Sequence, residues 1–419
     1  MNKLLIIKPS NLLSLTIFSL FILALFKPGQ EQGMYEWLIR PAYIVNFSKI
    51  TTLVSLFFIF LGLTYCLIIG VKKWGLKKDF LILNSIFIFS PFAIYSISIV
   101  NGADPVSSGL RILISILISI ILAFYFSFVV STKTQKDIFS VVVTPLLIAS
   151  VLFVLVNLLM FIFDRLAVIS SFGRMYGTTE HPNFLGVISA TIVLLLYLVL
   201  VTKKRNIKSN LNDLNSKLFN NNFLIVILLS AVMLVLLSGS RTAMSIIAAG
   251  LLIDTFCQRR NIGRNLLTLI VMSVVMLIFI TYFTQITEVE NVRALSTENT
   301  REGAWNDLLE DFLNYPLFGI GLSNLGASEN SILRALASSG IVGGVFFLII
   351  NIVSVRVSFL SIKYVGTNGY EVSPIIIGLL LGSILEGYLL DSLSYPVITF
   401  QYMINFAYLS AYYKRQNIN

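Results

Sequence analysis

Residues 287–344 read TEVENVRALSTENTREGAWNDLLEDFLNYPLFGIGLSNLGASENSILRALASSGIVGG. They form the longest stretch without a membrane-spanning pattern, and a strongly apolar segment lies on either side of them. The stretch contains a large share of the chain's acids and three arginines, Arg293, Arg301 and Arg334. A membrane protein that keeps one large polar loop and shortens the others is expected to have its chemistry in that loop.

Composition is typical of a polytopic membrane protein. Of the 419 residues, 57% are hydrophobic and 12% are charged, and the mean hydropathy is +0.88. These values lie far from those of a soluble domain. Two cysteines and one histidine exclude a disulfide framework, a cysteine-based metal site and a histidine cluster. The net charge of +10 comes from cations scattered between apolar runs, so membrane topology explains it better than a nucleic-acid partner does.

We predict an all-α fold, a single domain over residues 1–419 with about twelve transmembrane helices of roughly 20 residues each. One large outer-face loop, residues 285–330, interrupts the series. Lys27-Pro28-Gly29 offers no small-residue cleavage site after the first apolar run, so we expect an uncleaved anchor helix there. The predicted spans are Asn11–Phe26, Ser48–Val71, Phe80–Val100, Ser108–Val130, Ile138–Phe163, Pro182–Val201, Phe223–Leu237, Thr242–Phe256, Leu266–Phe283, Ser331–Val355, Ser373–Leu390 and Pro396–Tyr413.

The split between the seventh and eighth spans is placed at Ser238-Gly239-Ser240-Arg241. The apolar run from Phe223 to Phe256 is too long for one crossing, and its centre is polar.

Charge counting places both termini inside. With the N-terminus inside, the inner segments hold fourteen lysines and six arginines of the 30 cations, as the positive-inside rule requires. The outer segments hold only Lys27 and Lys49 but eight arginines. A guanidinium grips phosphate or carboxylate in two places and stays charged when desolvated. The alternative is that these arginines pair with outer acids. The outer arginines are Arg40, Arg111, Arg165, Arg174, Arg241, Arg293, Arg301 and Arg334.

Three of these arginines lie near the starts of inward-running spans. Arg174 precedes the sixth span, Arg241 opens the eighth, and Arg334 lies near the start of the tenth. Helix N-termini carry partial positive charge and free N–H groups, which favour an anion. The combination predicts a site for a lipid-linked phosphate group at the outer face.

The polar loop contains a predicted amphipathic helix that begins after Thr300 and ends before Pro316. Its apolar residues share one face with Arg301, and the acids lie mostly on the other, so we expect the helix to lie on the outer face of the membrane domain. Arg301 on the buried face needs an anionic partner, which is either a substrate or a structural acid. The residues expected on the buried face are Arg301, Trp305, Leu308, Leu309, Phe312 and Leu313.

Together these pieces resemble the superfamily of O-antigen ligases and Wzy-type O-antigen polymerases. The resemblance runs from about Phe172 to Gly344, and the twelve-span layout extends it over the chain. The ligases carry His-Asn where this chain has Glu329-Asn330, a departure that favours a polymerase. The matching motifs are Gly173-Arg174, Gly177, Pro182-Asn183, Ser238-Gly239-Ser240-Arg241-Thr242, Arg301, Trp305, Tyr315-Pro316-Leu317-Phe318-Gly319-Ile320-Gly321, Glu329-Asn330-Ser331, Gly340 and Gly343.

The resemblance implies a polymerase that joins repeat units carried on undecaprenyl pyrophosphate, in a bacterial cytoplasmic membrane with the site facing the exterior. The product is O-antigen or a capsule-type polysaccharide. Arginines would stabilise the pyrophosphate leaving group, and Glu329 would take the proton of the acceptor hydroxyl. No cofactor or metal is expected, and a chain-length regulator is a possible partner. The predicted catalytic residues are Glu329, Arg241 and Arg301, and the predicted substrate-binding residues are Arg174, Arg334, Asn330, Trp305, His181 and Asn183.

Several alternatives stay open at this point. Glu329 has the alternative role of a helix cap or a partner for Arg334. His181, before Pro182, is either a turn residue or a substrate contact. The whole chain is a lipid-linked glycan polymerase, a related transferase to another acceptor, or a twelve-span transporter or flippase. Against transport, the two halves of the sequence show no matching interrupted helices.

Overall fold

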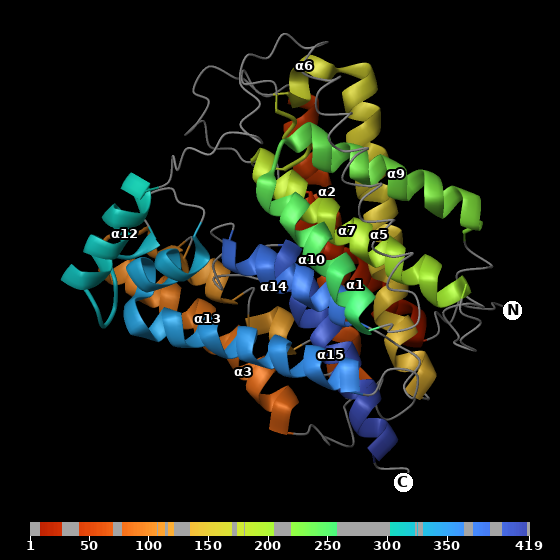
Figure 1. Cartoon of the computed structure of the whole chain (residues 1–419). Helices are drawn as coiled ribbons and strands as arrows, with labels where there is room; N and C mark the ends of the chain where they lie inside the picture. Colours follow the sequence, from red (N-terminus) through yellow and green to blue (C-terminus); the bar gives the residue numbers. More distant parts are fainter. Residues whose placement is uncertain are drawn as a thin grey trace, which may run out of the picture.

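The computed structural model describes residues 9–26, 42–69, 78–106, 108–113, 116–120, 135–169, 174–179, 181–204, 219–257, 302–322, 325, 330–363, 372–385 and 396–416. Over these residues the protein is helical, and a single β-bridge between Ile169 and Met175 is its sole extended pairing. Figure 1 shows the helices gathered into one bundle, with α12 at its left-hand edge. The predicted all-α class is confirmed.

Most of these helices agree with a predicted span to within about three residues, but α2 begins six residues earlier and α13 ends eight residues later than predicted. The longer apolar runs become helices because their residues are uniformly hydrophobic over about 20 positions. Their bounds are α1 Pro9–Leu25, α2 Ala42–Ile69, α3 Lys78–Val100, α5 Gln135–Phe163, α6 Arg165–Val168, α7 Pro182–Lys204, α9 Asn221–Ser238, α10 Arg241–Cys257, α12 Glu302–Asn314, α13 Ser331–Lys363, α14 Ser373–Leu385 and α15 Pro396–Gln416.

Five helices in the described part are long and apolar enough to cross a membrane. They contain Tyr43–Gly62, Val142–Phe163, Pro182–Val201, Asn221–Ser238 and Ser331–Ile362. Shorter apolar helices include Ser14–Leu25, Phe89–Val100 and Ser373–Leu385. The protein is an integral membrane protein, while the total of twelve spans stays a prediction. The predicted ninth span, residues 266–283, and residues 285–300 of the polar loop lie outside the described residues.

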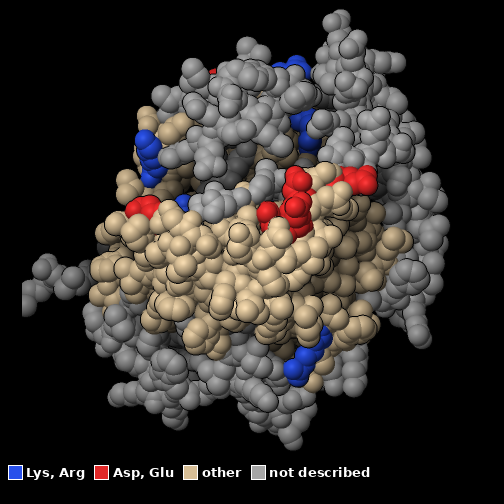
Figure 2. Space-filling model, turned by 90° about the vertical axis from the view of Figure 1, so that its left-hand side faces the viewer, with Lys and Arg blue, Asp and Glu red and all other residues tan. Residues whose placement is uncertain are grey.

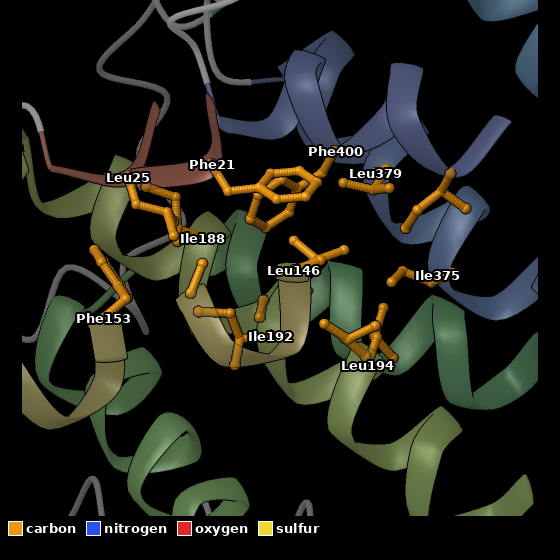
Figure 3. Packing of buried hydrophobic residues seen from close by; sticks show 14 of the residues in the cluster. Phe21, Leu25, Leu146, Phe153, Ile188, Ile192, Leu194, Ile375, Leu379 and Phe400 are labelled. Carbon is orange, nitrogen blue, oxygen red and sulfur yellow. The ribbon is translucent and has the colours of Figure 1, made fainter. Parts of the chain in front are cut away.

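A buried hydrophobic core joins helices that are distant in the sequence. Phe21 of α1 packs edge-on against Phe400 of α15, with ring centroids 5.2 Å apart. Figure 3 shows Leu146 of α5, Ile188 of α7 and Leu379 of α14 in the same cluster. This packing fixes the centre of the bundle, from which the helix ends project.

The outward-facing side of α13 is apolar, as expected for a helix surface in contact with lipid. Its exposed apolar side chains recur every three or four residues, so they form one stripe along the helix. The opposite face is buried and contains polar side chains, among them Asn351 and Ser354. An apolar surface over a partly polar interior is expected for a helix that packs within a bilayer. The stripe consists of Ile341, Val345, Leu348, Ile352, Val355, Phe359 and Ile362.

The polar face of α13 forms a hydrogen-bonded cluster with α14 and α15. Gln401 Nε2 donates to Asn351 Oδ1 at 3.2 Å and to Ser354 Oγ at 2.7 Å. Ser383 Oγ also donates to Asn351 Oδ1, at 3.2 Å, and Asn405 Nδ2 donates to Ser354 Oγ at 2.7 Å. These bonds hold three helices in register without any charged group.

Candidate active site

Several helix ends meet at one end of the bundle. The hydroxyl of Tyr43, at the start of α2, donates to Asp164 Oδ2 at 2.5 Å, just beyond the end of α5. The backbone N–H of Met175 donates to Leu237 O at 2.9 Å, in the last turn of α9. The loop that precedes α7 therefore lies directly against the end of α9.

Arg174 is the central side chain of this corner. Its Nε donates to the carbonyl oxygen of Ser238 at 2.8 Å, at the last residue of α9. Its Nη2 donates to Oδ1 of Asn183, which is buried in the first turn of α7. Arg174 also packs against Gly239, because a Cβ at that position would lie 3.3 Å from Arg174 Nε. The guanidinium thus joins the end of α9 to the start of α7.

The turn at Ser238-Gly239-Ser240-Arg241 separates α9 from α10, as predicted. Gly239 is the left-handed residue that ends α9, with φ of 58°, and its N–H donates to Leu236 O. Ser240 Oγ accepts from the N–H of Ala243 at 3.2 Å and so caps α10. Arg241 is the first residue of α10 and is exposed. The turn that Arg174 contacts therefore presents Arg241 at a helix N-terminus.

His181 has the geometry of a turn residue. Its Nδ1 accepts from the N–H of Asn183 at 3.2 Å, and its ring lies edge-on to Phe184 with centroids 6.2 Å apart. Pro182 is the first residue of α7, as expected for a proline that fixes φ without needing a donor. The half-buried ring of His181 lies in the same turn as Asn183, one of the groups that holds Arg174.

The predicted amphipathic helix is α12, and it ends two residues before Pro316. Leu308 is buried, while Trp305 and Phe312 are half-buried. The Nε1 atom of Trp305 is buried and has no hydrogen-bond partner among the described residues. Leu309 and Leu313 were expected on the buried face but are 44% and 67% exposed, so the apolar face is wider than its contact with the protein. Hydrophobicity alone does not distinguish a protein neighbour from lipid, so burial of these two side chains against the membrane stays a prediction.

The helix α13 reverses direction inside the stretch that was predicted as the start of the tenth span. Ser339 and Gly340 have non-helical backbone angles, and Gly340 has φ of 60° and ψ of −153°. With 33 residues, α13 would be about 50 Å long if it were straight, against a hydrocarbon thickness of about 30 Å. Beyond the break, residues 341–363 form a helix about 35 Å long, which is long enough to cross the hydrocarbon layer.

The motif from Tyr315 to Gly321 packs its backbone against this break. The N–H of Ile320 donates to Ala337 O at 2.8 Å, and the N–H of Ile341 donates to Pro316 O at 2.8 Å. Glycine is required on both sides of the contact. A Cβ on Gly319 would lie 2.4 Å from Ala337 O, and a Cβ on Gly340 would lie 2.3 Å from the backbone of Leu317. The glycine-rich motif thus holds the short helical segment 331–338 in place.

This segment carries two of the predicted site residues. Asn330 caps α13, since its Oδ1 accepts from the N–H groups of Ile332 at 3.1 Å and Leu333 at 3.2 Å. Arg334 is half-buried on the first turn, and its Nε atom is buried. Two further candidates from the polar loop, Arg301 and Glu329, lie outside the described residues.

The predicted residues therefore form two groups. Arg174, Asn183 and His181 surround the turn that precedes Arg241, whereas Trp305, Asn330 and Arg334 belong to the α12–α13 unit. Helix starts with partial positive charge occur in both groups, at α7, α10 and α13. Such a set of guanidinium groups and helix N-termini is suited to an anion such as phosphate.

Sequence reasoning missed two residues that support these groups. The amide of Asn157 on α5 holds the loop before α7, with its Oδ1 accepting from the N–H of Thr178 at 2.9 Å. Ser98 near the end of α3 accepts from the N–H of Leu322 at 3.0 Å, next to the glycine-rich motif. The available signal was a polar residue inside an otherwise apolar span.

Comparison with known proteins identifies one domain. The family model described as O-Antigen ligase matches residues 223–348, from α9 through the first half of α13. The match includes Arg241, Trp305, Asn330 and Arg334 but not Arg174, His181 or Asn183. No curated protein matches the chain significantly. The match supports a membrane transferase of the O-antigen ligase and polymerase type.

Proposed function

We propose a reaction for this membrane protein, whose residues 223–348 match the family model described as O-Antigen ligase. The protein is a polymerase that joins oligosaccharide repeat units carried on undecaprenyl pyrophosphate. The growing glycan moves from its lipid carrier to a hydroxyl of another lipid-linked unit. The reaction takes place at the outer face of a bacterial cytoplasmic membrane, and both termini are cytoplasmic. A chain-length regulator is a further proposed partner.

The observation that carries the proposal is the corner around Arg174. This guanidinium donates to Ser238 O and to Asn183, and so it brings the start of α7 to the turn that presents Arg241. Arg241 is exposed at a helix N-terminus, where its positive charge adds to the partial charge of the helix. A diphosphate bound there meets an exposed guanidinium together with the N–H groups of the helix start.

The reaction needs charge stabilisation and one proton acceptor. The acceptor hydroxyl oxygen attacks the anomeric carbon, and the bond between that carbon and the phosphate oxygen breaks. Pyrophosphate leaves with the electron pair and needs no general acid, because it is a weak base. Arg241, Arg301 and Arg334 are proposed to stabilise its negative charge, and Arg174 to hold the corner in place. Four further residues are proposed to contact the substrate or the side chains that hold it, namely Trp305, His181, Asn183 and Asn330.

Glu329 is the proposed proton acceptor. It directly precedes Asn330, the residue that caps α13. A carboxylate next to a helix start is stabilised as the anion, which weakens it as a base, whereas partial desolvation strengthens it. If Glu329 is this base, Glu329→Gln folds normally and loses rate.

The second candidate is a ligase-like transferase, which the family description itself favours. Purified protein in liposomes distinguishes the candidates. Lipid-linked repeat units alone yield a ladder of longer lipid-linked chains if the protein is a polymerase. Product that forms only when a separate acceptor is added identifies a ligase-like enzyme, and movement of lipid between leaflets without glycan transfer overturns both proposals.

A further inference from the structure

The helix α12 and the turn that follows it expose an apolar surface. On α12, Trp305 and Leu308 contact the protein, Leu309 and Leu313 are exposed, and most of the acids lie on other sides of the helix. In the turn after the helix, Tyr315, Leu317 and Phe318 are 58%, 62% and 62% exposed. We call Leu309, Leu313, Tyr315, Leu317 and Phe318 the interfacial patch.

The interfacial patch is continuous with the exposed stripe of α13. The N–H of Ile341 donates to Pro316 O at 2.8 Å, so the first residue of the stripe lies against the turn that carries Leu317. A Cβ on Gly340 would meet the backbone of Leu317 and Phe318 within 2.6 Å, which confirms the close approach of the two segments. The stripe continues from Ile341 to Ile362 along a helix of membrane-spanning length.

Charge lies at the borders of this apolar surface. On α12 the exposed Asp307 projects from a side of the helix different from that of Leu309 and Leu313. Glu310 lies at the edge of that side, three residues before Leu313, and Glu302 lies in the first turn, at the end of the helix far from Leu313. Figure 2 shows acidic side chains along one border of a broad band without charge, and a basic side chain at its opposite border. A band of this kind, with charges only at its margins, matches the hydrocarbon layer of a bilayer and its two interfaces.

We propose that the interfacial patch is inserted into the lipid leaflet at the α12 end of the bundle, with Leu313, Leu317 and Phe318 among the acyl chains. Helix α12 then lies in the interface with Asp307 and Glu310 toward water, as an amphipathic helix does when its apolar face meets lipid. A lipid occupant is favoured over a protein partner because the patch continues a stripe on a membrane-spanning helix. Insertion fixes α12, and through the glycine-rich motif it fixes the level of the segment 331–338 relative to the membrane surface.

Site-directed spin labels measure this insertion directly. Cys66 and Cys257 are replaced by serine in the full-length chain, and a nitroxide is attached to Cys introduced at Leu313 or Phe318. Asp307→Cys on the same helix serves as the water-facing control, and Leu348→Cys on α13 as the lipid-facing control. In proteoliposomes, positions 313 and 318 should have several-fold higher collision rates with oxygen than with a water-soluble nickel complex, like position 348. Position 307 should show the reverse.

Two outcomes would overturn the proposal. If positions 313 and 318 collide with the nickel complex as often as position 307 does, the patch faces water. If the labels are shielded from both reagents and show dipolar broadening between chains, a second copy of the protein covers the patch. The measurement needs no catalysis, so it stands or fails separately from the proposed transferase reaction.

Discussion

Arg174 and Arg241 belong to the same corner of the bundle but differ in what surrounds them. Arg174 is half-buried and donates to Ser238 O and Asn183 Oδ1, whereas Arg241 is exposed at the start of α10. The sequence suggested phosphate binding for both, because both are outer arginines near helix starts. The structure gives Arg174 contacts that join two helix ends, whereas a substrate-facing role for the exposed Arg241 stays a proposal.

Replacement of Arg241 by lysine should reduce glycan transfer nearly as much as replacement by alanine. Lysine keeps the charge but loses the planar fork that contacts a phosphate in two places. Loss of one group that stabilises developing negative charge typically lowers the rate by about 10²–10³-fold. Transfer rates of both variants in proteoliposomes check this, and full activity in the lysine variant would remove the argument for two-pronged contact.

Arg174→Ala should instead destabilise the protein. The variant leaves Ser238 O without one donated bond and Asn183 Oδ1 without another, and each buried group left unsatisfied costs about 1–3 kcal/mol. The melting temperature should therefore fall clearly, whereas that of Arg241→Ala should change little because the residue is exposed. Thermal unfolding in the same detergent compares the two, and an unchanged melting temperature for Arg174→Ala would count against the supporting role.

Among the helices, α13 is divided into two segments by a break at Ser339 and Gly340. The break lets one apolar sequence form two helical segments, of which the first carries Asn330 and Arg334 and the second has the exposed stripe. The motif from Tyr315 to Gly321 holds the break in place by backbone hydrogen bonds, so its glycines have a structural role.

Gly340→Ala should destabilise the protein by about 2 kcal/mol or more, because alanine at this backbone conformation is strained and its Cβ would overlap the backbone of Leu317. Gly303→Ala in α12 is the matched control. A Cβ there meets nothing within 4 Å, and the gain in helix propensity is about 0.5–1 kcal/mol. Thermal unfolding of both variants tests the difference, and equal stability of the two would disprove the account of the break.

The polar contacts between α13 and α15 allow a graded test. Gln401→Leu removes two donated hydrogen bonds and should cost about 1–2 kcal/mol. Asn405→Leu removes only one donated bond. Each substitution also removes a buried amide oxygen that has no partner among the described residues, so the number of donated bonds is what differs. The cost of Asn405→Leu should be less than about 1 kcal/mol. Equilibrium unfolding in detergent gives both values, and a larger loss for the asparagine variant would show that this hydrogen-bond pattern is incorrect.

For the whole molecule, the distribution of polarity determines how the bundle lies in lipid. The core between α1, α5, α7, α14 and α15 is apolar, the contact of α13 with α14 and α15 includes amides and hydroxyls, and the outer stripe of α13 is apolar again. The exposed Arg356 lies beside this stripe in the last third of the helix, whereas a soluble bundle of the same helices would be expected to show charge along the whole stripe.

Leu348→Lys tests the lipid-facing orientation. Leu348 is 58% exposed, so a lysine there has room, but a charge near the middle of a spanning helix costs about 2.5–3.5 kcal/mol in a bilayer. Ile332→Lys at the start of α13 should cost much less, because its ammonium group reaches the interface. Stability in nanodiscs should fall for the first variant only, and an unaffected Leu348→Lys would mean that the stripe does not face lipid.

The helical class, the bounds of most helices, the division at Ser238–Arg241 and the amphipathic helix before Pro316 could all be predicted from the amino-acid sequence. These features follow from local properties, namely the length of apolar runs and the placement of glycine, proline and capping residues. Three features became visible in the folded chain alone: Arg174 joins α9 to α7, α13 breaks at Gly340, and Leu309 and Leu313 remain exposed. Each of these features depends on a segment that is distant in the sequence. That segment accepts a hydrogen bond from Arg174, brings its backbone close to Gly340, or leaves Leu309 and Leu313 without a protein neighbour. Local sequence patterns do not show which distant segment lies nearby.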